Sequence, residues 1–213
     1  MTIYSFCSTI QVSKEREENQ ILTEEQRRER KRLVNEEYAK YVEKYREGDT
    51  FYHVTMQENV ESLLKNGFDP NMIGSSGGCQ GGAGFSVTWT EMDAWQWGDK
   101  FYGWGRGDLV VVKIPLPGVK LATHQEIDNM RQNMLEWGKE QDYCDPDQEK
   151  FVSTEKLKSL AVGEYASTGW ILTGLYLRSQ GYDGYMVGVD EVVIINFDLL
   201  KSSAFSKMSN GSN

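Results

Sequence analysis

The chain has 213 residues, of which 39% are hydrophobic and 12% aromatic, enough to bury the core of one globular domain. Its net charge of −9 and isoelectric point near 4.9 disfavour a nucleic-acid partner, because clustered lysine and arginine supply most of the affinity for phosphate backbones. The three cysteines, Cys7, Cys79 and Cys144, are widely spaced and form no C-x-x-C pair. Neither a disulfide framework nor a metal centre is predicted, and reducing cytosol is the default compartment.

The first residues, MTIYSFCSTIQ, lack a basic region, and serine and threonine interrupt their apolar run. No segment approaches the roughly 18 consecutive apolar residues that cross a bilayer, so no membrane insertion is expected. We expect a protein that is cytoplasmic, or that is exported into a host cell without a cleaved signal peptide.

Residues 14–47 are strongly charged and predict a helix. Thr23 followed by Gln26 is typical of an N-cap with a capping box, and Gly48 marks the predicted end. Apolar side chains recur at steps of three and four residues: Leu33, Val34, Tyr38, Tyr41, Val42 and Tyr45. Residues 1–48 are therefore predicted to form an amphipathic helical segment that packs on or precedes the main domain, with a partner-binding or membrane-binding helix as the alternative.

The rest of the chain mixes short strands with helices and predicts one domain over residues 49–203, followed by a flexible tail at 204–213. The predicted strands are FYHVT at 51–55, GFSVT at 84–88, LVVVKI at 109–114, a short strand after the GYDGY turn, and EVVIINF at 191–197. The predicted helices cover 56–65, 91–98 and 170–179, whereas 122–163 is predicted to be polar and irregular, with weak helix signals at 128–137. Without a repeat or a regular βαβ alternation, an α+β fold is favoured.

The segment IGSSGGCQGGAG, residues 73–84, is a glycine-rich loop whose backbone could approach a phosphate or ribose closely. It lacks the lysine and the serine or threonine of a P-loop. It also lacks the strand-to-helix context of a Rossmann fingerprint. Both of these nucleotide-binding motifs are therefore excluded.

Two titratable residues lie in apolar strands. His53 is in the middle of FYHVT, where a structural histidine satisfied by a backbone carbonyl is the alternative to a functional one. Glu191 shares a strand face with Val193 and Ile195, and a buried carboxylate is costly unless it is hydrogen-bonded. Glu191 is therefore a candidate functional carboxylate with a partner, although an acid at a solvated strand end is also open. His124, in LATHQEID, is interpreted as a surface histidine.

Three segments resemble the diphtheria-toxin-like branch of the ADP-ribosyltransferase superfamily, which includes the poly(ADP-ribose) polymerases and many bacterial toxins. The first is Tyr-His-Val-Thr at 52–55, followed by NVESLLKNGF; the second is GFSVT at 84–88, followed by an alanine and two tryptophans. The third is DEVVI at 190–194, after GYDGY. They occur in the order of that family's His, Tyr and Glu motifs and cover roughly residues 50–200. Val54 and Ser86 depart from the pattern, since the family has glycine and tyrosine there.

The resemblance implies two small antiparallel sheets with NAD⁺ bound between them as the co-substrate. It implies that His53 binds the adenosine-side ribose, that Thr55 contacts the nicotinamide ribose, and that the backbone of Val54 binds the carboxamide. Glu191 would stabilise positive charge on the nicotinamide ribose, with His53 as the second catalytic residue. The remaining cofactor-binding residues would be Gly84, Phe85, Ser86 and Trp97, with Trp97 stacked on nicotinamide and Trp95 or Phe85 as substitutes.

The implied activity is transfer of one ADP-ribose from NAD⁺ to a macromolecular acceptor, expected to be a protein, as in a bacterial effector or toxin. Arginine modification is disfavoured, because Val189 stands two residues before Glu191 and His53 replaces the required arginine. An RNA 2′-phosphotransferase would need a basic cluster that the sequence does not contain. NAD⁺ hydrolysis and a non-catalytic binding module are the alternatives, and Ser86 in the tyrosine position favours the second.

Overall fold

The computed structural model of the protein describes residues 23–45, 48–72, 84–103, 107–160 and 167–208. The glycine-rich segment at 73–83, the end of the predicted tail and two of the three cysteines lie outside these ranges. The chain divides into two compact units, residues 1–41 and 42–213, whereas the sequence placed the boundary after residue 48.

The helix α2, Glu24–Tyr45, begins at the predicted cap. The Gln26 amide N–H donates to the Thr23 hydroxyl at 3.2 Å, and the Thr23 N–H donates to the Gln26 side chain at 2.8 Å. These reciprocal bonds satisfy two amide groups that a helix start leaves without intrahelical partners. The predicted capping box is confirmed.

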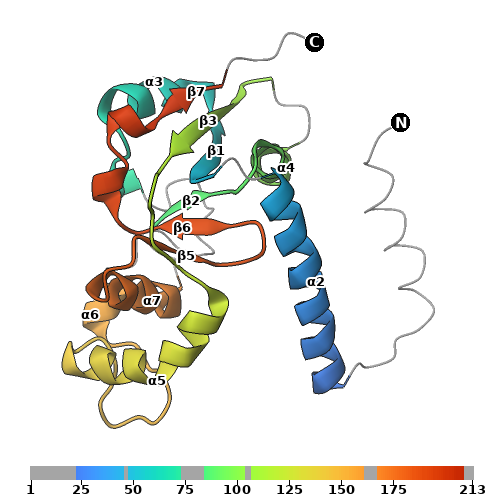
Figure 1. Cartoon of the computed structure of the whole chain (residues 1–213). Helices are drawn as coiled ribbons and strands as arrows, with labels where there is room; N and C mark the ends of the chain where they lie inside the picture. The colour runs from blue at the N-terminus through green and yellow to red at the C-terminus, as the bar shows by residue number, and fades with distance from the viewer. Residues whose placement is uncertain (1–22, 46–47, 73–83, 104–106, 161–166, 209–213) are drawn as a thin grey trace. The chain divides into compact units, whose positions relative to one another are not determined.

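Two β-sheets form the second unit (Figure 1). Sheet A has the order β1-β3-β7, with bounds Thr50–Met56, Leu109–Pro115 and Ser206–Lys207. Sheet B has the order β2-β6-β5-β4, with bounds Phe85–Val87, Val192–Ile194, Gly184–Met186 and Leu121–Ala122. All neighbouring strands are antiparallel except β4 and β5. The prediction of an α+β fold with largely antiparallel sheets is confirmed.

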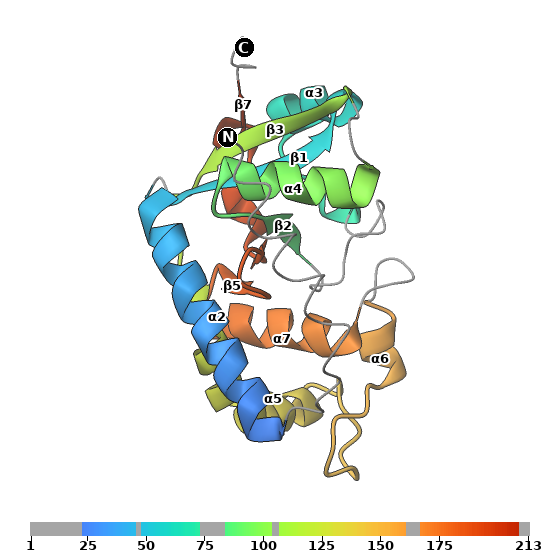
Figure 2. The ribbon, with the colours of Figure 1, turned by 90° about the vertical axis from the view of Figure 1, so that its right-hand side faces the viewer.

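Helices lie beside both sheets, and their bounds are α3 Gln57–Asn66, α4 Glu91–Tyr102, α5 His124–Glu140, α6 Glu155–Lys158 and α7 Thr168–Ser179. Three 3₁₀ turns complete the described secondary structure: η1 Pro70–Met72, η3 Phe197–Leu199 and η4 Ser202–Ala204. Figure 2 shows α4 running across sheet A, and α5 and α7 lying near β5 of sheet B. Each sheet therefore has its own helical layer.

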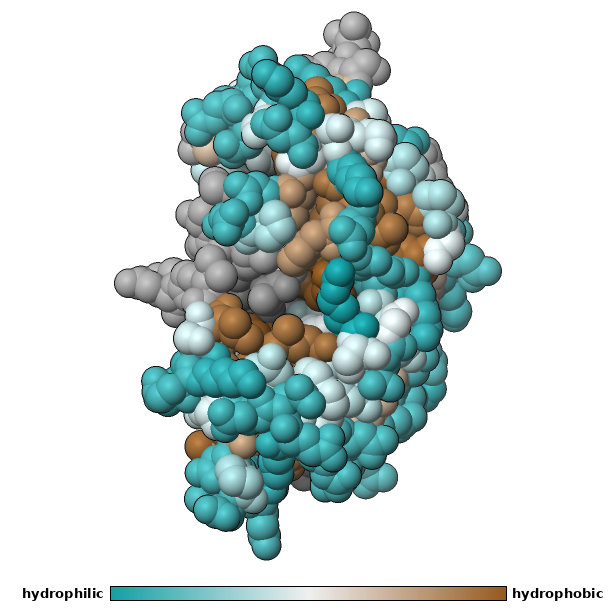
Figure 3. All heavy atoms as spheres, turned by 90° about the vertical axis from the view of Figure 1, so that its left-hand side faces the viewer, coloured by the Kyte–Doolittle hydropathy of each residue, from teal (hydrophilic) through white to brown (hydrophobic). Residues whose placement is uncertain are grey.

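Two separate apolar clusters follow from this arrangement. One lies between sheet A and α4 and contains Tyr52, Val54, Ala94, Leu109 and Val111. The other joins sheet B to α5 and α7, and its fully buried members include Cys144, Leu157, Leu177, Tyr185 and Val193. A face with an apolar band between two hydrophilic regions is visible in Figure 3. Sheets A and B are nevertheless in contact through side chains, since the ring of His53 in β1 lies 4.4 Å from that of Phe85 in β2.

A backbone contact joins the two sheets. The Tyr52 N–H donates to the Thr88 carbonyl at 3.0 Å, and the Thr88 N–H donates back to the Tyr52 carbonyl at 2.8 Å. Because Thr88 directly follows β2, this pair fixes the end of β2, an edge strand of sheet B, against the edge of β1 that faces away from β3. The residues next to it along both strands, His53 and Ser86 among them, are thereby brought close together.

The prediction for residues 122–163 was only partly right: the weak helix signals at 128–137 lie within α5, but this helix is regular and 17 residues long rather than part of an irregular segment. Thr123 caps it: its hydroxyl accepts from the Glu126 N–H at 3.3 Å, and its own N–H donates to the Glu126 carboxylate at 2.8 Å. The sequence T-H-Q-E carries this capping-box pattern and could have predicted the start. The helix α4 is also longer than the predicted 91–98, since it continues to Tyr102.

Candidate functional site

His53 lies in β1 and reaches across to β2. Its Nδ1 is 2.8 Å from the Ser86 carbonyl oxygen, and its ring lies 4.4 Å from the ring of Phe85. Burial lowers the pKa of His53 to about 4, and the hydrogen bond to Ser86 only partly offsets this. The imidazole is therefore neutral at pH 7. Because a carbonyl can only accept, Nδ1 carries the hydrogen and Nε2 is left as an acceptor, suited to a ligand hydroxyl.

Glu191 lies directly before β6 and is only 8% exposed. The Ser86 hydroxyl donates to its Oε1 at 2.8 Å. Burial raises the pKa of Glu191, the Ser86 hydrogen bond opposes that rise, and the charges of Asp190 and Lys100 act in opposite directions, Asp190 raising it. The hydrogen-bond partner expected for a buried carboxylate is therefore present, and it is Ser86.

Ser86 connects the two titratable groups. Its carbonyl binds His53 and its hydroxyl binds Glu191, while its backbone is paired with Val193 of β6. A single β2 residue thus holds an imidazole from sheet A and a carboxylate from sheet B. The contact of His53 with a backbone carbonyl is also what the structural alternative expected, so this bond alone does not distinguish the two interpretations.

Val54 and Thr55, which follow His53 in β1, have different surroundings. Val54 packs in the cluster with α4, and its side chain would lie 2.8 Å from a Cβ placed on Gly98. The backbone N–H and C=O of Tyr52 bind Thr88 on the edge of β1 that faces away from β3. Residues two apart in a strand direct these groups to the same edge, so the N–H and C=O of Val54 also point away from β3. Thr55 is only 5% exposed, and its hydroxyl accepts a long hydrogen bond of 3.4 Å from Asn59.

Trp97 lies on α4, and its indole N–H donates to the Asp190 carboxylate at 3.0 Å. The indole is stacked on Phe101, with ring centroids 4.9 Å apart and planes 9° apart. The Lys100 ammonium lies 4.6 Å from the Trp97 centroid and 5.6 Å from that of Phe101. The spacing W-x-x-K-F places these three side chains on one side of a helix, a signal that the sequence offered and that we did not use.

Two residues with a predicted role in cofactor binding, Gly84 and Phe85, make close packing contacts. Gly84 allows β2 to approach β6, because a Cβ there would lie 2.2 Å from a Val193 methyl group and 2.8 Å from the Ile194 carbonyl. Phe85 is 5% exposed and is surrounded by the rings of His53, Phe68 and Phe205. Both residues are buried.

The substitutes considered for Trp97 do not share its position. Trp95 is 37% exposed, and its indole N–H donates to Glu91 of the same helix at 3.2 Å. Two residues apart on a helix, Trp95 and Trp97 point in nearly opposite directions. With Phe85 buried, Trp97 is the one of the three that lies beside the carboxylates.

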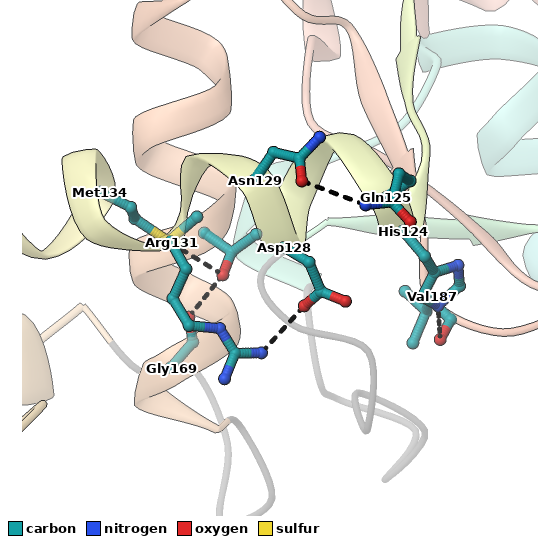
Figure 4. Close-up of polar contacts among 9 residues, drawn as sticks. His124, Gln125, Asp128, Asn129, Arg131, Met134, Gly169 and Val187 are labelled. Carbon is teal, nitrogen blue, oxygen red and sulfur yellow. Dashed lines mark hydrogen bonds and ion pairs between the residues drawn. The ribbon is translucent and has the colours of Figure 1, made fainter. Parts of the chain in front are cut away.

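His124, interpreted from the sequence as a surface histidine, is partly exposed and makes one hydrogen bond to another segment. Its side chain is half-buried at the start of α5, and its Nε2 is 2.9 Å from the Val187 carbonyl, in the turn between β5 and β6 (Figure 4). The histidine therefore connects α5 to the turn that leads to Glu191. Farther along α5, Met134 contacts α7: its sulfur lies 3.5 Å from the hydroxyl of Thr173, which donates to the Gly169 carbonyl at 2.9 Å.

Among the residues that the structure describes, no three His, Cys, Asp or Glu side chains are grouped so that they could hold a metal ion. The described helices also include none with the length and apolar character needed to cross a membrane.

Gly84→Ala is expected to destabilise the protein by about 1–3 kcal/mol, because the new methyl group would overlap Val193 and the Ile194 carbonyl. Thermal unfolding should show a decrease in Tm of roughly 3–10 °C for a unit of this size. Gly107→Ala is the matched control, since nothing lies within 4 Å of a Cβ at that position. Equal Tm values for the two variants would contradict the close packing of β2 on β6.

The low pKa of His53 predicts a pH-dependent stability. Between pH 6.5 and about 4 the unfolded chain binds a proton that the folded protein does not, so the free energy of unfolding should decrease by up to about 3 kcal/mol as the pH falls. His53→Gln keeps a donor for the Ser86 carbonyl and removes the titration, so its decrease should be smaller. Urea unfolding across this pH range measures the difference.

Glu191 changes the pH dependence of stability in the opposite direction, because its folded-state pKa is raised and its contribution to the free energy of unfolding is lost as the pH rises through that value. The parent protein and His53→Gln both contain Glu191, so comparing their free energies of unfolding cancels this contribution. Parallel stability curves for the two proteins would rule out a depressed His53 pKa.

The comparisons with known proteins identify no relative: no protein-family model matches the sequence, and no curated protein matches it.

Proposed function

We propose that the protein is a mono-ADP-ribosyltransferase on an ADP-ribosyltransferase-like fold, which uses NAD⁺ to modify a macromolecular acceptor, expected to be a protein. The observation that carries the proposal is the Glu191 carboxylate, 8% exposed and held by the Ser86 hydroxyl at 2.8 Å, while the carbonyl of the same serine binds a neutral His53. The resemblance of the three motifs supports it, and so does the pair of largely antiparallel sheets on which they lie.

The residues beside Glu191 suit parts of NAD⁺. Nε2 of His53 is an acceptor for a ribose hydroxyl, and the outward-pointing N–H and C=O of Val54 match the acceptor and donor of a carboxamide. The Trp97 ring would be the aromatic wall, with its N–H fixed by Asp190, although Phe101 is stacked on it and the Lys100 ammonium lies 4.6 Å from its centroid. The related family's tyrosine ring has no counterpart here. Thr55, being buried, would need to change its contact with Asn59 before it could reach a ribose.

NAD⁺ supplies an activated ribose: the bond between the ribose carbon and nicotinamide breaks, the bonding electrons leave with nicotinamide, and the acceptor adds to that carbon and loses a proton. Positive charge develops on the ribose during this step. The ionised Glu191 is a fixed negative charge that stabilises it where it develops, and the Ser86 hydroxyl keeps the carboxylate oriented. His53 stays neutral and binds without transferring a proton.

The test is incubation of the full chain with NAD⁺ labelled in the ADP-ribose part, together with host-cell lysates, while nicotinamide release is followed. Label on protein together with nicotinamide release supports the transferase. Nicotinamide release with free labelled ADP-ribose assigns water as the acceptor and makes the protein a glycohydrolase.

Two other results would replace the proposal. Calorimetric NAD⁺ binding without nicotinamide release would identify a non-catalytic binding module, the alternative suggested by Ser86. Neither binding nor release by the folded protein would end the NAD⁺ hypothesis altogether.

A further inference from the structure

We propose that Trp97 and His124 are positioning residues that hold the turn at 187–191 from two sides and thereby fix the place of Glu191. The role given to Glu191 rests on the proposed function. The two contacts themselves do not, so they can be tested independently of NAD⁺.

The turn at 187–191 connects β5 to β6 and ends in the candidate carboxylate. It is closed by one backbone hydrogen bond, from the Val187 N–H to the Glu191 carbonyl at 3.1 Å. Its residues 187–190 form bends rather than regular structure and are partly exposed, whereas Val192, Val193 and Ile194 are fully buried. The carboxylate is thus attached to a rigid strand on one side and to a short irregular segment on the other.

Trp97 holds the turn from the side of sheet A. The helix α4 packs on β1 and β3, and the Trp97 indole is fixed there by its stack on Phe101. Its N–H donates to Asp190, the residue immediately before Glu191. Neighbouring residues in extended chain point in opposite directions, so Asp190 can face α4 while Glu191 faces Ser86. The bond therefore connects the helical layer of one sheet to a turn of the other.

His124 holds the same turn from the side of sheet B. It is the first residue of α5, whose start is fixed by the capping box of Thr123 and Glu126. Its Nε2 donates to the Val187 carbonyl, because a carbonyl can only accept (Figure 4). The N–H of the same Val187 closes the turn on Glu191. The histidine therefore acts on Glu191 through the backbone of Val187.

The position of the turn matters because the bond between Ser86 and Glu191 is short and directional. A carboxylate that stabilises developing charge must lie within a fraction of an ångström of its productive place. Loss of either contact would leave the buried strand intact and release the turn, so the expected effect falls on the rate and not on folding. Residues that act only by packing would instead change the stability.

The first test uses hydrogen exchange measured by NMR on ¹⁵N-labelled full chain without NAD⁺. Asp190→Ala is expected to speed exchange of the Trp97 indole N–H about tenfold, whereas Asp190→Asn, which keeps an acceptor oxygen, should not. His124→Leu is expected to speed exchange of the Val187 amide by a similar factor, and His124→Gln, which keeps a donor, should restore most of the protection. Unchanged exchange in Asp190→Ala and His124→Leu would overturn the proposal, whatever the protein does with NAD⁺.

The second test is steady-state nicotinamide release. Trp97→Phe, which keeps an aromatic ring and loses the N–H, and His124→Leu should each lower kcat about five- to tenfold with KM for NAD⁺ changed less than about twofold. Trp97→Phe combined with Asp190→Ala should be no worse than the poorer single variant, because both remove the same bond. A change in KM alone, or additive losses in that pair, would contradict a positioning role.

Two matched controls distinguish the loss of the Trp97 and His124 contacts from general effects of substitutions in α4 and α5. Trp95→Phe removes an indole N–H from the same helix as Trp97, but one that donates only to Glu91. Gln125→Leu alters the residue next to His124, whose amide donates only along α5 to Asn129 (Figure 4). Both should leave kcat and the two exchange rates unchanged. If neither the parent nor any variant releases nicotinamide from NAD⁺ while the exchange rates change as expected, the proposed function is wrong, but the positioning of the turn at 187–191 by Trp97 and His124 is supported.

Discussion

Glu191→Gln is expected to lower kcat for nicotinamide release by about 10²- to 10³-fold while the Kd for NAD⁺ changes by less than about threefold. The neutral amide fills the same space and can still accept from the Ser86 hydroxyl, so the ground-state contacts persist. What is lost is the negative charge beside the ribose, which acts only as positive charge develops there. Single-turnover kinetics and calorimetry measure the two quantities separately.

The same variant also predicts an increase in stability at neutral pH. Burial raises the pKa of Glu191, so the ionised side chain is less favourable in the folded protein than in the unfolded chain. Replacing it with an uncharged side chain of the same shape removes that cost, as is often seen at functional sites. A Glu191→Gln protein that is less stable than the parent, or that retains full activity, would assign the carboxylate a structural role.

Ser86→Ala is expected to lower kcat about 10- to 100-fold at neutral pH and to move the acidic limb of the rate profile to higher pH. The hydroxyl is the hydrogen-bond donor that opposes the rise in the pKa of Glu191, so its removal raises that pKa further. The active form is ionised, and its population therefore begins to fall at a higher pH. The dependence of kcat on pH measures the shift.

Three further variants test whether the acidic limb of the kcat–pH profile reports the titration of Glu191. Ser86→Thr keeps the hydroxyl and should resemble the parent. Asp190→Asn removes a charge that raises the pKa of Glu191, so its limb should move to lower pH, whereas Lys100→Met removes a charge that lowers it and should move the limb to higher pH. A limb that does not move in Ser86→Ala, or that moves the same way in Asp190→Asn and Lys100→Met, would show that Glu191 is not the group that titrates.

Local sequence patterns predicted the secondary structure well where one signal dominated. The β-branched run LVVVKI became β3, and FYHVT became β1. The prediction was only partly right for α5: weak helix signals were found at 128–137, but the polar residues hid the full length of the helix that Thr123 caps. It overextended the last strand, since the apolar run EVVIINF is longer than β6, which ends at Ile194. An apolar run indicates which residues are buried more directly than it indicates where a strand ends.

The candidate site was only partly predictable. A carboxylate in an apolar strand must find a partner if it is buried, so the sequence alone indicated that Glu191 would be hydrogen-bonded. It could not indicate that the partner is Ser86, which is 105 residues away along the chain. Nor could it separate Phe85, which is buried among other rings, from Trp97, because both are aromatic residues near the same motif.

The sequence by itself determined which residue types were available: one histidine and one carboxylate in apolar strands, a serine in the segment GFSVT, and a helical segment with two tryptophans. Tertiary structure alone decided their relations, because the joining of β1 to β2 at Tyr52 and Thr88 places His53 on the Ser86 carbonyl. The antiparallel register of β2 and β6 places the Ser86 hydroxyl on Glu191. Hydrogen bonds act over about 3 Å, whereas these residues are separated by tens of positions, so only the folded sheets could bring them together.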